Sequence, residues 1–177
     1  MFHSNTELLI DYWRARRGER TVPARADIDP SGFPRLAPAV FIAARESGDV
    51  RLRLAGEAVL EWHGRPLAGE SFTGLWRRDH RGRLMALLGA ALAGAEPVVL
   101  TAVASDEALA VRFEILFAPL TGPSGAADRL LGFYQPLSRT AAGPLGDLAI
   151  VAVGGAPLAE TAHPSLRLAA LDGRRIA

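Results

Sequence analysis

The spacing of hydrophobic residues predicts a helix at the start of the chain and a β-hairpin soon after it. Apolar side chains recur at helical spacing over residues 5–17, and Gly18 marks the expected end of this helix. Residues 39–45 and 50–55 are strand-like runs joined by a short polar turn, and the second run alternates apolar residues with arginine. We therefore expect a hairpin with one face buried.

The later part of the chain predicts a group of helices followed by three more strands. Two strands are not stable alone, so the later strands must complete their sheet, and the intervening helices must cover one face of it. We expect an α+β domain: a five-stranded antiparallel sheet with a helix cluster on one face and an extra N-terminal helix. The remaining predicted elements are helices over residues 56–62, 70–76 and 78–93, and strands over 98–104, 110–120 and 129–137.

The chain divides into three parts by composition and periodicity. Its 177 residues suit one domain with an extension. We predict an N-terminal helix over residues 1–20 and a core over 21–137. Residues 138–177 are rich in Ala, Gly and Pro, and we interpret them as a tail with one candidate strand at 166–171.

Two missing residue types exclude several kinds of chemistry. Cysteine is absent, which excludes disulfides, thiolate nucleophiles and Cys-ligated metal centres. All 20 basic residues are arginine, so Schiff-base and P-loop lysine chemistry are excluded too. A net charge of +1 gives no reason to expect a nucleic-acid partner. The sequence shows neither a signal peptide nor an apolar run of membrane-spanning length, so we expect a cytoplasmic protein with no membrane contact.

Four segments carry a resemblance to a known family: Tyr12-Trp13 with Arg17-Gly18, residues 23–30 (PARADIDP), residues 53–56 (RLAG) and residues 64–72 (GRPLAGESF). Together they resemble the PAS sensory domains, particularly the bacterial single-domain subgroup. The resemblance covers residues 5–137, and the predicted order of strands and helices agrees with it. It is specific for the fold, because none of the matching motifs is catalytic.

The resemblance implies a sensor or interaction module that holds a small ligand between sheet and helices and uses its N-terminal helix for dimerisation or output. Photoactive flavin-binding members use a cysteine, so a flavin–cysteinyl adduct is excluded here. Haem-binding members need an axial histidine, and His63 and His80 are the only candidates. We interpret both as solvated or helix-capping and expect no haem. The cofactor, if there is one, stays unknown.

Large apolar side chains around the predicted cavity are candidates for ligand binding, although the same residues could fill a solid core. Trp62 and Trp76 are the best candidates for the rim, because each ends a short helix and its indole N–H needs a partner. The candidate ligand-binding residues are Phe41, Leu54, Trp62, Trp76, Phe113 and Phe133.

Two surfaces are candidates for contact with a partner. The apolar side of the N-terminal helix either forms a dimer interface or docks on the chain's own sheet; its residues are Leu8, Leu9, Tyr12 and Trp13. A cluster of arginines precedes and begins the predicted helix 78–93, where it could bind an anion or an acidic partner. This cluster comprises Arg77, Arg78, Arg81 and Arg83.

No arrangement of residues indicates a catalytic or metal site. The four histidines have no second ligand at metal-binding spacing, and no nucleophile is paired with a base. We therefore predict a non-enzymatic PAS-like module in bacterial signalling that acts through ligand binding, protein contact or both, as a homodimer or with a signalling partner. Two alternatives stay open: a small-molecule enzyme on a cone-like α+β fold, and a scaffold with a filled core.

Overall fold

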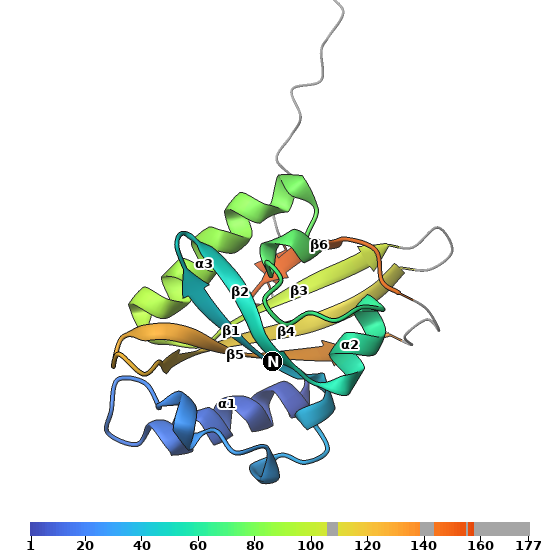
Figure 1. Cartoon of the computed structure of the whole chain (residues 1–177). Helices are drawn as coiled ribbons and strands as arrows, with labels where there is room; N and C mark the ends of the chain where they lie inside the picture. Colours follow the sequence, from blue (N-terminus) through green and yellow to red (C-terminus); the bar gives the residue numbers. More distant parts are fainter. Residues whose placement is uncertain (106–109, 139–143, 155, 158–177) are drawn as a thin grey trace, which may run out of the picture.

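The computed structural model describes residues 1–105, 110–138, 144–154 and 156–157. They form a seven-stranded antiparallel sheet in the order β2-β1-β5-β4-β3-β6-β7, with helices on both faces (Figure 1). The predicted α+β class, the five-stranded core, the helix cluster and the N-terminal helix are confirmed. Two further strands extend the sheet beyond β3. The candidate strand at 166–171 lies outside the described residues.

The outer face of the sheet is covered by α1 (Ser4–Arg17) and the segment that follows it. The cap of α1 is His3, whose Nδ1 accepts from the Asn5 N–H at 3.1 Å. Gly18 ends the helix with φ +55°, a conformation that favours glycine. The segment after it contains three 3₁₀ turns, η1 (Arg25–Asp27), η2 (Pro30–Gly32) and η3 (Ala37–Ala39).

The hairpin of β1 (Val40–Glu46) and β2 (Asp49–Ala55) forms one end of the sheet. Its turn places Ser47 and Gly48 at positive φ, as a tight two-residue hairpin requires. The free edge of β2 is covered by residues 69–72, because the Leu52 N–H donates to Glu70 O and the Phe72 N–H to Val50 O. This segment protects an edge that could otherwise pair with another chain.

The inner face is covered by the helices between β2 and β3. They are α2 (Glu57–His63), the 3₁₀ turns η4 (Thr73–Leu75) and η5 (Arg78–His80), and α3 (Arg81–Gly94). The remaining strands are β3 (Val98–Ser105), β4 (Ala110–Thr121), β5 (Ala127–Pro136), β6 (Leu148–Val153) and β7 (Ala156–Pro157). β5 pairs with both β1 and β4 and so joins the two halves of the sheet.

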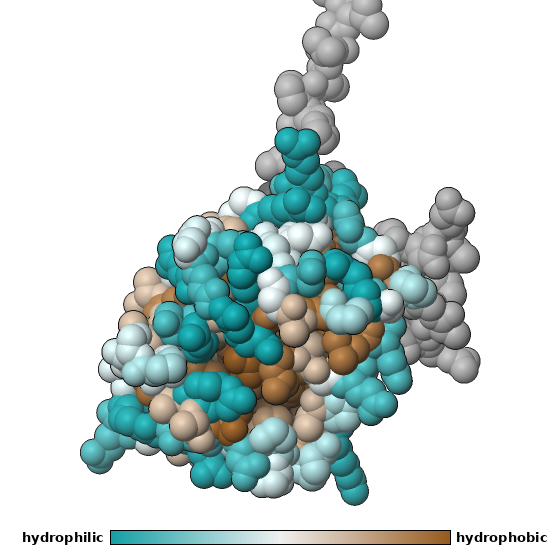
Figure 2. All heavy atoms as spheres, viewed as in Figure 1, coloured by the Kyte–Doolittle hydropathy of each residue, from teal (hydrophilic) through white to brown (hydrophobic). Residues whose placement is uncertain are grey.

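Successive side chains on each strand point alternately into two apolar cores, one on each face of the sheet. On β4, Phe113, Ile115 and Phe117 enter the inner core, while Leu116 and Ala118 enter the outer core beneath α1. Gly132 on β5 lets the Phe41 ring lie over this strand on the inner face, because a Cβ there would overlap the ring. The side seen in Figure 2 is mostly polar, with apolar residues gathered near its centre.

Candidate functional site

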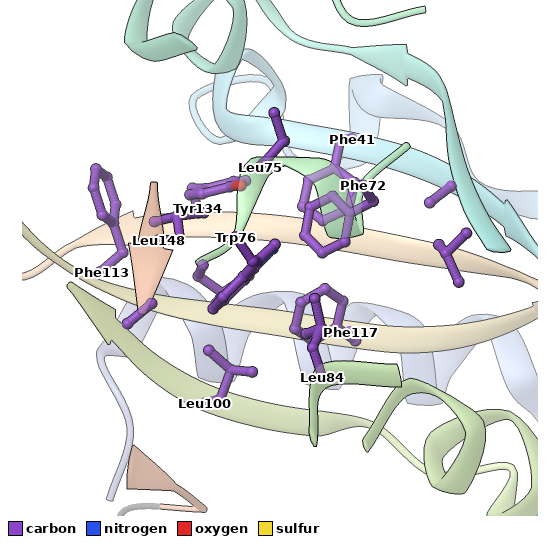
Figure 3. Close-up of a cluster of buried hydrophobic side chains, with 14 of the residues drawn as sticks. Phe41, Phe72, Leu75, Trp76, Leu84, Leu100, Phe113, Phe117, Tyr134 and Leu148 are labelled. Atoms are coloured by element: carbon purple, nitrogen blue, oxygen red, sulfur yellow. The ribbon is translucent and has the colours of Figure 1, made fainter. Parts of the chain in front are cut away.

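The inner core beneath α2 combines aromatic rings with buried polar groups. The Trp62 ring lies 5.2 Å from Phe113 and 5.9 Å from Tyr134, between ring centroids. The Phe41 ring stacks on Phe72 at 5.0 Å. Trp62 is half-buried, whereas the other four residues are fully buried. The four fully buried rings lie together over strands β1, β4 and β5 (Figure 3), and Trp62 packs against this cluster.

A histidine and a tyrosine form a polar pair inside this core. His63 Nε2 lies 3.3 Å from the Tyr134 hydroxyl, and the contact is buried. Burial, assisted by the positive charge of Arg65, lowers the pKa of His63 to about 4, and burial also raises the pKa of Tyr134 above its usual value. Both side chains are therefore neutral near pH 7, and one hydrogen bond joins them.

Of the two arrangements predicted for His63, solvated or helix-capping, the solvated one is wrong, and the cause is the direction of α2. The helix buries Val59 and His63, four residues apart, on the side that faces the sheet. Gly64 then turns the chain away with φ +62°. The half-buried His80 accepts through Nδ1 from the Ile150 N–H at 3.2 Å, and it therefore holds a strand rather than standing in solvent.

Trp76 adds a second polar group to the inner core. Its indole is fully buried, and its N–H meets no acceptor among the described residues. Figure 3 shows the ring among Phe117, Tyr134 and Leu148. An unsatisfied donor in such a position costs about 1–3 kcal/mol. The core therefore carries a hydrogen-bonding capacity that its own packing does not use.

A segment that we call the strap, residues 144–150, closes over the helix cluster. The Leu145 N–H donates to Trp62 O at 2.6 Å, and Leu148 O accepts from the Arg77 N–H at 2.9 Å. In addition, the Ile150 N–H donates to His80 Nδ1, and β6 pairs with β3. The strap thus links the end of α2 directly to the sheet.

The structure brings four of the six predicted ligand-binding residues together and separates the other two. Phe41, Trp62, Trp76 and Phe113 share the inner core. Leu54 is 50% exposed, because the register of β1 and β2 shifts after Ile42 and turns Leu54 to the opposite side. Phe133 lies in the outer core, because its neighbour Tyr134 points inward.

The residues predicted for a dimer surface on α1 mostly face the chain's own sheet. Leu9 and Trp13 are fully buried in the outer core, and the Trp13 N–H donates to Pro119 O at 2.7 Å. Tyr12 packs edge-on against Phe33, with ring centroids 4.9 Å apart. Leu8 alone is substantially exposed, at 49%. Of the two predicted arrangements, the structure shows docking on the sheet.

The four arginines of the predicted anion patch have different local roles. Arg77 forms an ion pair with Asp79 at 2.9 Å. Arg81 turns inward and donates to Trp76 O at 2.9 Å. Arg78 and Arg83 are exposed. The cluster therefore partly serves to hold the turn before α3.

A set of polar contacts that the sequence did not single out anchors the start of α1. The buried Glu114 accepts from the His3 N–H at 3.0 Å, and Asn5 donates to the buried Gln135 at 2.9 Å. Strand alternation alone could have assigned Glu114 and Gln135 to the outer face, but nothing local indicates that a helix end would bury them. A groove of about 290 Å³ that neither residue lines lies between α1 and the start of β3.

The described residues contain no group of three or more side chains suited to hold a metal ion. Across the same part of the chain, no helix is both long enough and apolar enough to span a membrane.

Comparison with protein families assigns the chain. The PAS domain family matches residues 1–135, and the chain belongs to this family of sensory signalling domains. No curated protein matches it.

The solved structures that are similar to this chain include the following three. The Rhodobacter sphaeroides LOV protein has 18% identity and a TM-score of 0.48, with 64% of this chain and 70% of that chain covered. A structure of RsLOV has 24% identity and a TM-score of 0.45 over 61% and 65% of the two chains. An RNA-binding Light-Oxygen-Voltage receptor has 17% identity and a TM-score of 0.45; the match covers 65% of this chain but only 35% of the receptor.

Proposed function

We propose that this chain is a non-enzymatic regulatory PAS module that binds a small, mainly apolar ligand in the inner core beneath α2. The observation that carries the proposal is the set of buried polar groups on His63, Tyr134 and Trp76 within an aromatic core. Polar groups in a core reduce stability unless they are fully paired, and such local conflicts are typical of functional sites. A ligand with a hydrogen-bond acceptor would satisfy the Trp76 N–H.

The chemistry of the site favours binding over catalysis. A histidine with a pKa of about 4 is a weak base at pH 7, and a buried neutral tyrosine is a poor acid. The surrounding rings favour an uncharged ligand, because a charge would be desolvated without a counter-ion. The chain has no cysteine, so the ligand is held without a thiol adduct.

Binding in this core requires part of it to open. The Phe41, Phe72 and Phe117 rings already pack with centroids 5.0–6.1 Å apart, and half-buried Trp62 is the natural gate at the end of α2. If the end of α2 moves with the Trp62 ring, the hydrogen bond from the Leu145 N–H to the Trp62 carbonyl is disturbed, and with it the strap. Ligand occupancy would in this way reach β6 and a protein partner that contacts the sheet edge.

Native mass spectrometry of the protein purified from its own host, compared with its denatured mass, tests the proposal. We expect an additional non-covalent mass that decreases in Trp76→Phe and Tyr134→Phe. Thr6→Val is a matched control. Like Trp76→Phe, it removes a buried polar group that has no partner among the described residues, but this group lies at the outer face of the sheet, away from the proposed ligand site. Equal native and denatured protein masses, or equal retention by all variants, would reject ligand binding in the inner core.

One observation favours the scaffold alternative. Phe41, Phe72 and Phe117 are fully buried and in mutual ring contact, and the fully buried Phe113 is joined to Phe41 through the Tyr134 ring. A domain with a filled core would act through its surfaces alone. In that case native mass spectrometry shows no bound small molecule, while a partner protein still binds.

A further inference from the structure

The outward side of α3 is made almost entirely of apolar residues. Twelve consecutive residues, 84–95, carry no polar side chain. Only one side of the helix is buried, through Leu84, Leu88, Ala91 and Leu92. Figure 1 shows α3 along one border of the fold, where its other side faces outward. A surface helix normally carries polar residues on its solvent side, so this face has the composition of an interface.

Small residues on this outward side follow the spacing of a helix–helix seam. Gly82, Ala86, Gly89 and Ala93 are separated by four, three and four residues, which is the a/d spacing of a coiled coil. Gly82, Ala86 and Ala93 are exposed, and a Cβ built on Gly89 would meet no atom within 4 Å. A row of such small side chains lets the axis of a second helix approach closely.

The charges at the two ends of α3 indicate the direction of the second helix. The first turn has no acidic residue and carries the exposed Arg83, and it follows Arg78 and Asp79, whose charge Arg77 of the same chain pairs; the last turn has no basic residue and is followed by Glu96. Both ends therefore oppose the helix dipole. An antiparallel second helix would place Glu96 and its negative helix end beside the arginines, while a parallel one would bring the arginine clusters together.

We propose that α3 is the docking surface for a second copy of this chain, with the two α3 helices antiparallel about a two-fold axis. One copy of the seam complements another, since Gly82 would face Ala93 and Ala86 would face Gly89. The same symmetry forms both Arg–Glu contacts at once. Glu96 also binds Arg17 of its own chain at 2.8 Å, so it would bridge two arginines.

The size of this surface sets the expected strength of the dimer. A helix of 14 residues is about 21 Å long, and one helix pair of this length buries less than the roughly 1,200 Å² of a standard interface. The dimer should therefore be reversible and depend on concentration. Its Kd should lie in the micromolar range or above.

Sedimentation equilibrium of the full chain, from low micromolar to near-millimolar concentration, tests this interface. We expect a monomer–dimer equilibrium that Ala86→Glu weakens by at least about tenfold, because the carboxylate enters the seam. The matched control is Ala15→Glu on the exposed side of α1, which should leave the Kd unchanged. Circular dichroism checks that both variants fold, as exposed helical alanines should allow.

A charge exchange distinguishes self-association from docking of another protein. Arg83→Glu should weaken the dimer several-fold, and Arg83→Glu with Glu96→Arg should restore it, because Arg83 faces Leu92 of the second copy and so lies about one helical turn from its Glu96. A monomer at every concentration would overturn the proposal. A dimer that responds equally to Ala86→Glu and Ala15→Glu would also overturn it, as would an Ala86→Glu protein that fails to fold, since α3 would then be covered within its own chain.

Discussion

The two longest helices contain 14 residues each and cover opposite faces of the sheet, yet they are built on different principles. α1 has an acidic residue in its first turn and three arginines in its last, which agrees with the helix dipole. α3 has the opposite charge distribution and an apolar outward side. The difference indicates that α1 is complete within one chain, whereas α3 has a face that its own chain leaves without contacts among the described residues.

The contacts of α1 support this contrast. Its start is anchored by Glu114 and Gln135, and Trp13 binds Pro119 near its end. Arg17 lies over the Trp13 ring at 4.9 Å and also binds Glu96. α1 is therefore a fixed cover of the outer core. The aromatic residues that suggest an interface in the sequence are the ones that hold the helix in place.

The largest expected effect is the loss of the main anchor of α1. Trp13→Ala should lower the free energy of unfolding by about 3–5 kcal/mol, because it leaves a cavity in the outer core and removes the bond to Pro119. Urea unfolding followed by circular dichroism measures this. Trp13→Phe should cost less, since it keeps much of the packing. A loss below about 1 kcal/mol for Trp13→Ala would show that α1 is held mainly by its polar end.

The burial of His63 in the inner core should lower the free energy of unfolding in acid. In the folded protein its pKa is about 4, against 6.5 for a free histidine, so the unfolded chain binds a proton first as the pH falls. The contribution of neutral His63 to the free energy of unfolding is fully present above pH 6.5. It decreases as the pH falls toward 4, by a total on the order of 3 kcal/mol. Unfolding at a series of pH values should show a shallower decrease for His63→Gln. Identical pH profiles would show that His63 is solvated after all.

A smaller effect is expected at the end of α1. Arg17→Ala removes one ion pair with an exposed glutamate and one contact with the Trp13 ring, so we expect a loss of about 1 kcal/mol. Urea unfolding at low and high salt separates the two contributions, because salt screens only the ion pair strongly. Arg14→Ala, at the exposed pair with Asp11, is the control and should change stability less.

The smallest expected change has the opposite sign. Gly89→Ala should stabilise the chain by about 0.5–1 kcal/mol, because alanine is the better helix former and its methyl enters open space. Urea unfolding at low micromolar protein concentration, where the proposed dimer is dissociated, gives the monomer value. A destabilised monomer would mean that α3 is covered within the chain.

Most of the fold could be predicted from local patterns. The period of two in β4, the polar turn of the hairpin and the helical spacing in α1 and α3 are all local signals. β6 was not predicted, because its short apolar run follows a Gly- and Pro-rich segment and gains its strand structure from pairing with β3. The Ile42 register shift was equally invisible, and it alone moved Leu54 out of the inner core.

The candidate site depended still more on tertiary contacts. Phe41, Trp62, Trp76 and Phe113 could be selected from the sequence because large apolar residues gather wherever the sheet is covered. The pairing of His63 with Tyr134 could not, because these residues are 71 positions apart and meet only when α2 lies on β5.

The sequence by itself determined the α+β class, the position of the main helices and core strands, and the exclusion of cysteine and lysine chemistry, because these depend on composition and on spacing within one element. Only the tertiary structure decided which face each residue occupies: Trp13 inside its own chain, His63 buried, and the outward side of α3 without contacts among the described residues. Those outcomes depend on the angle and register at which distant segments pack, and no local pattern encodes them.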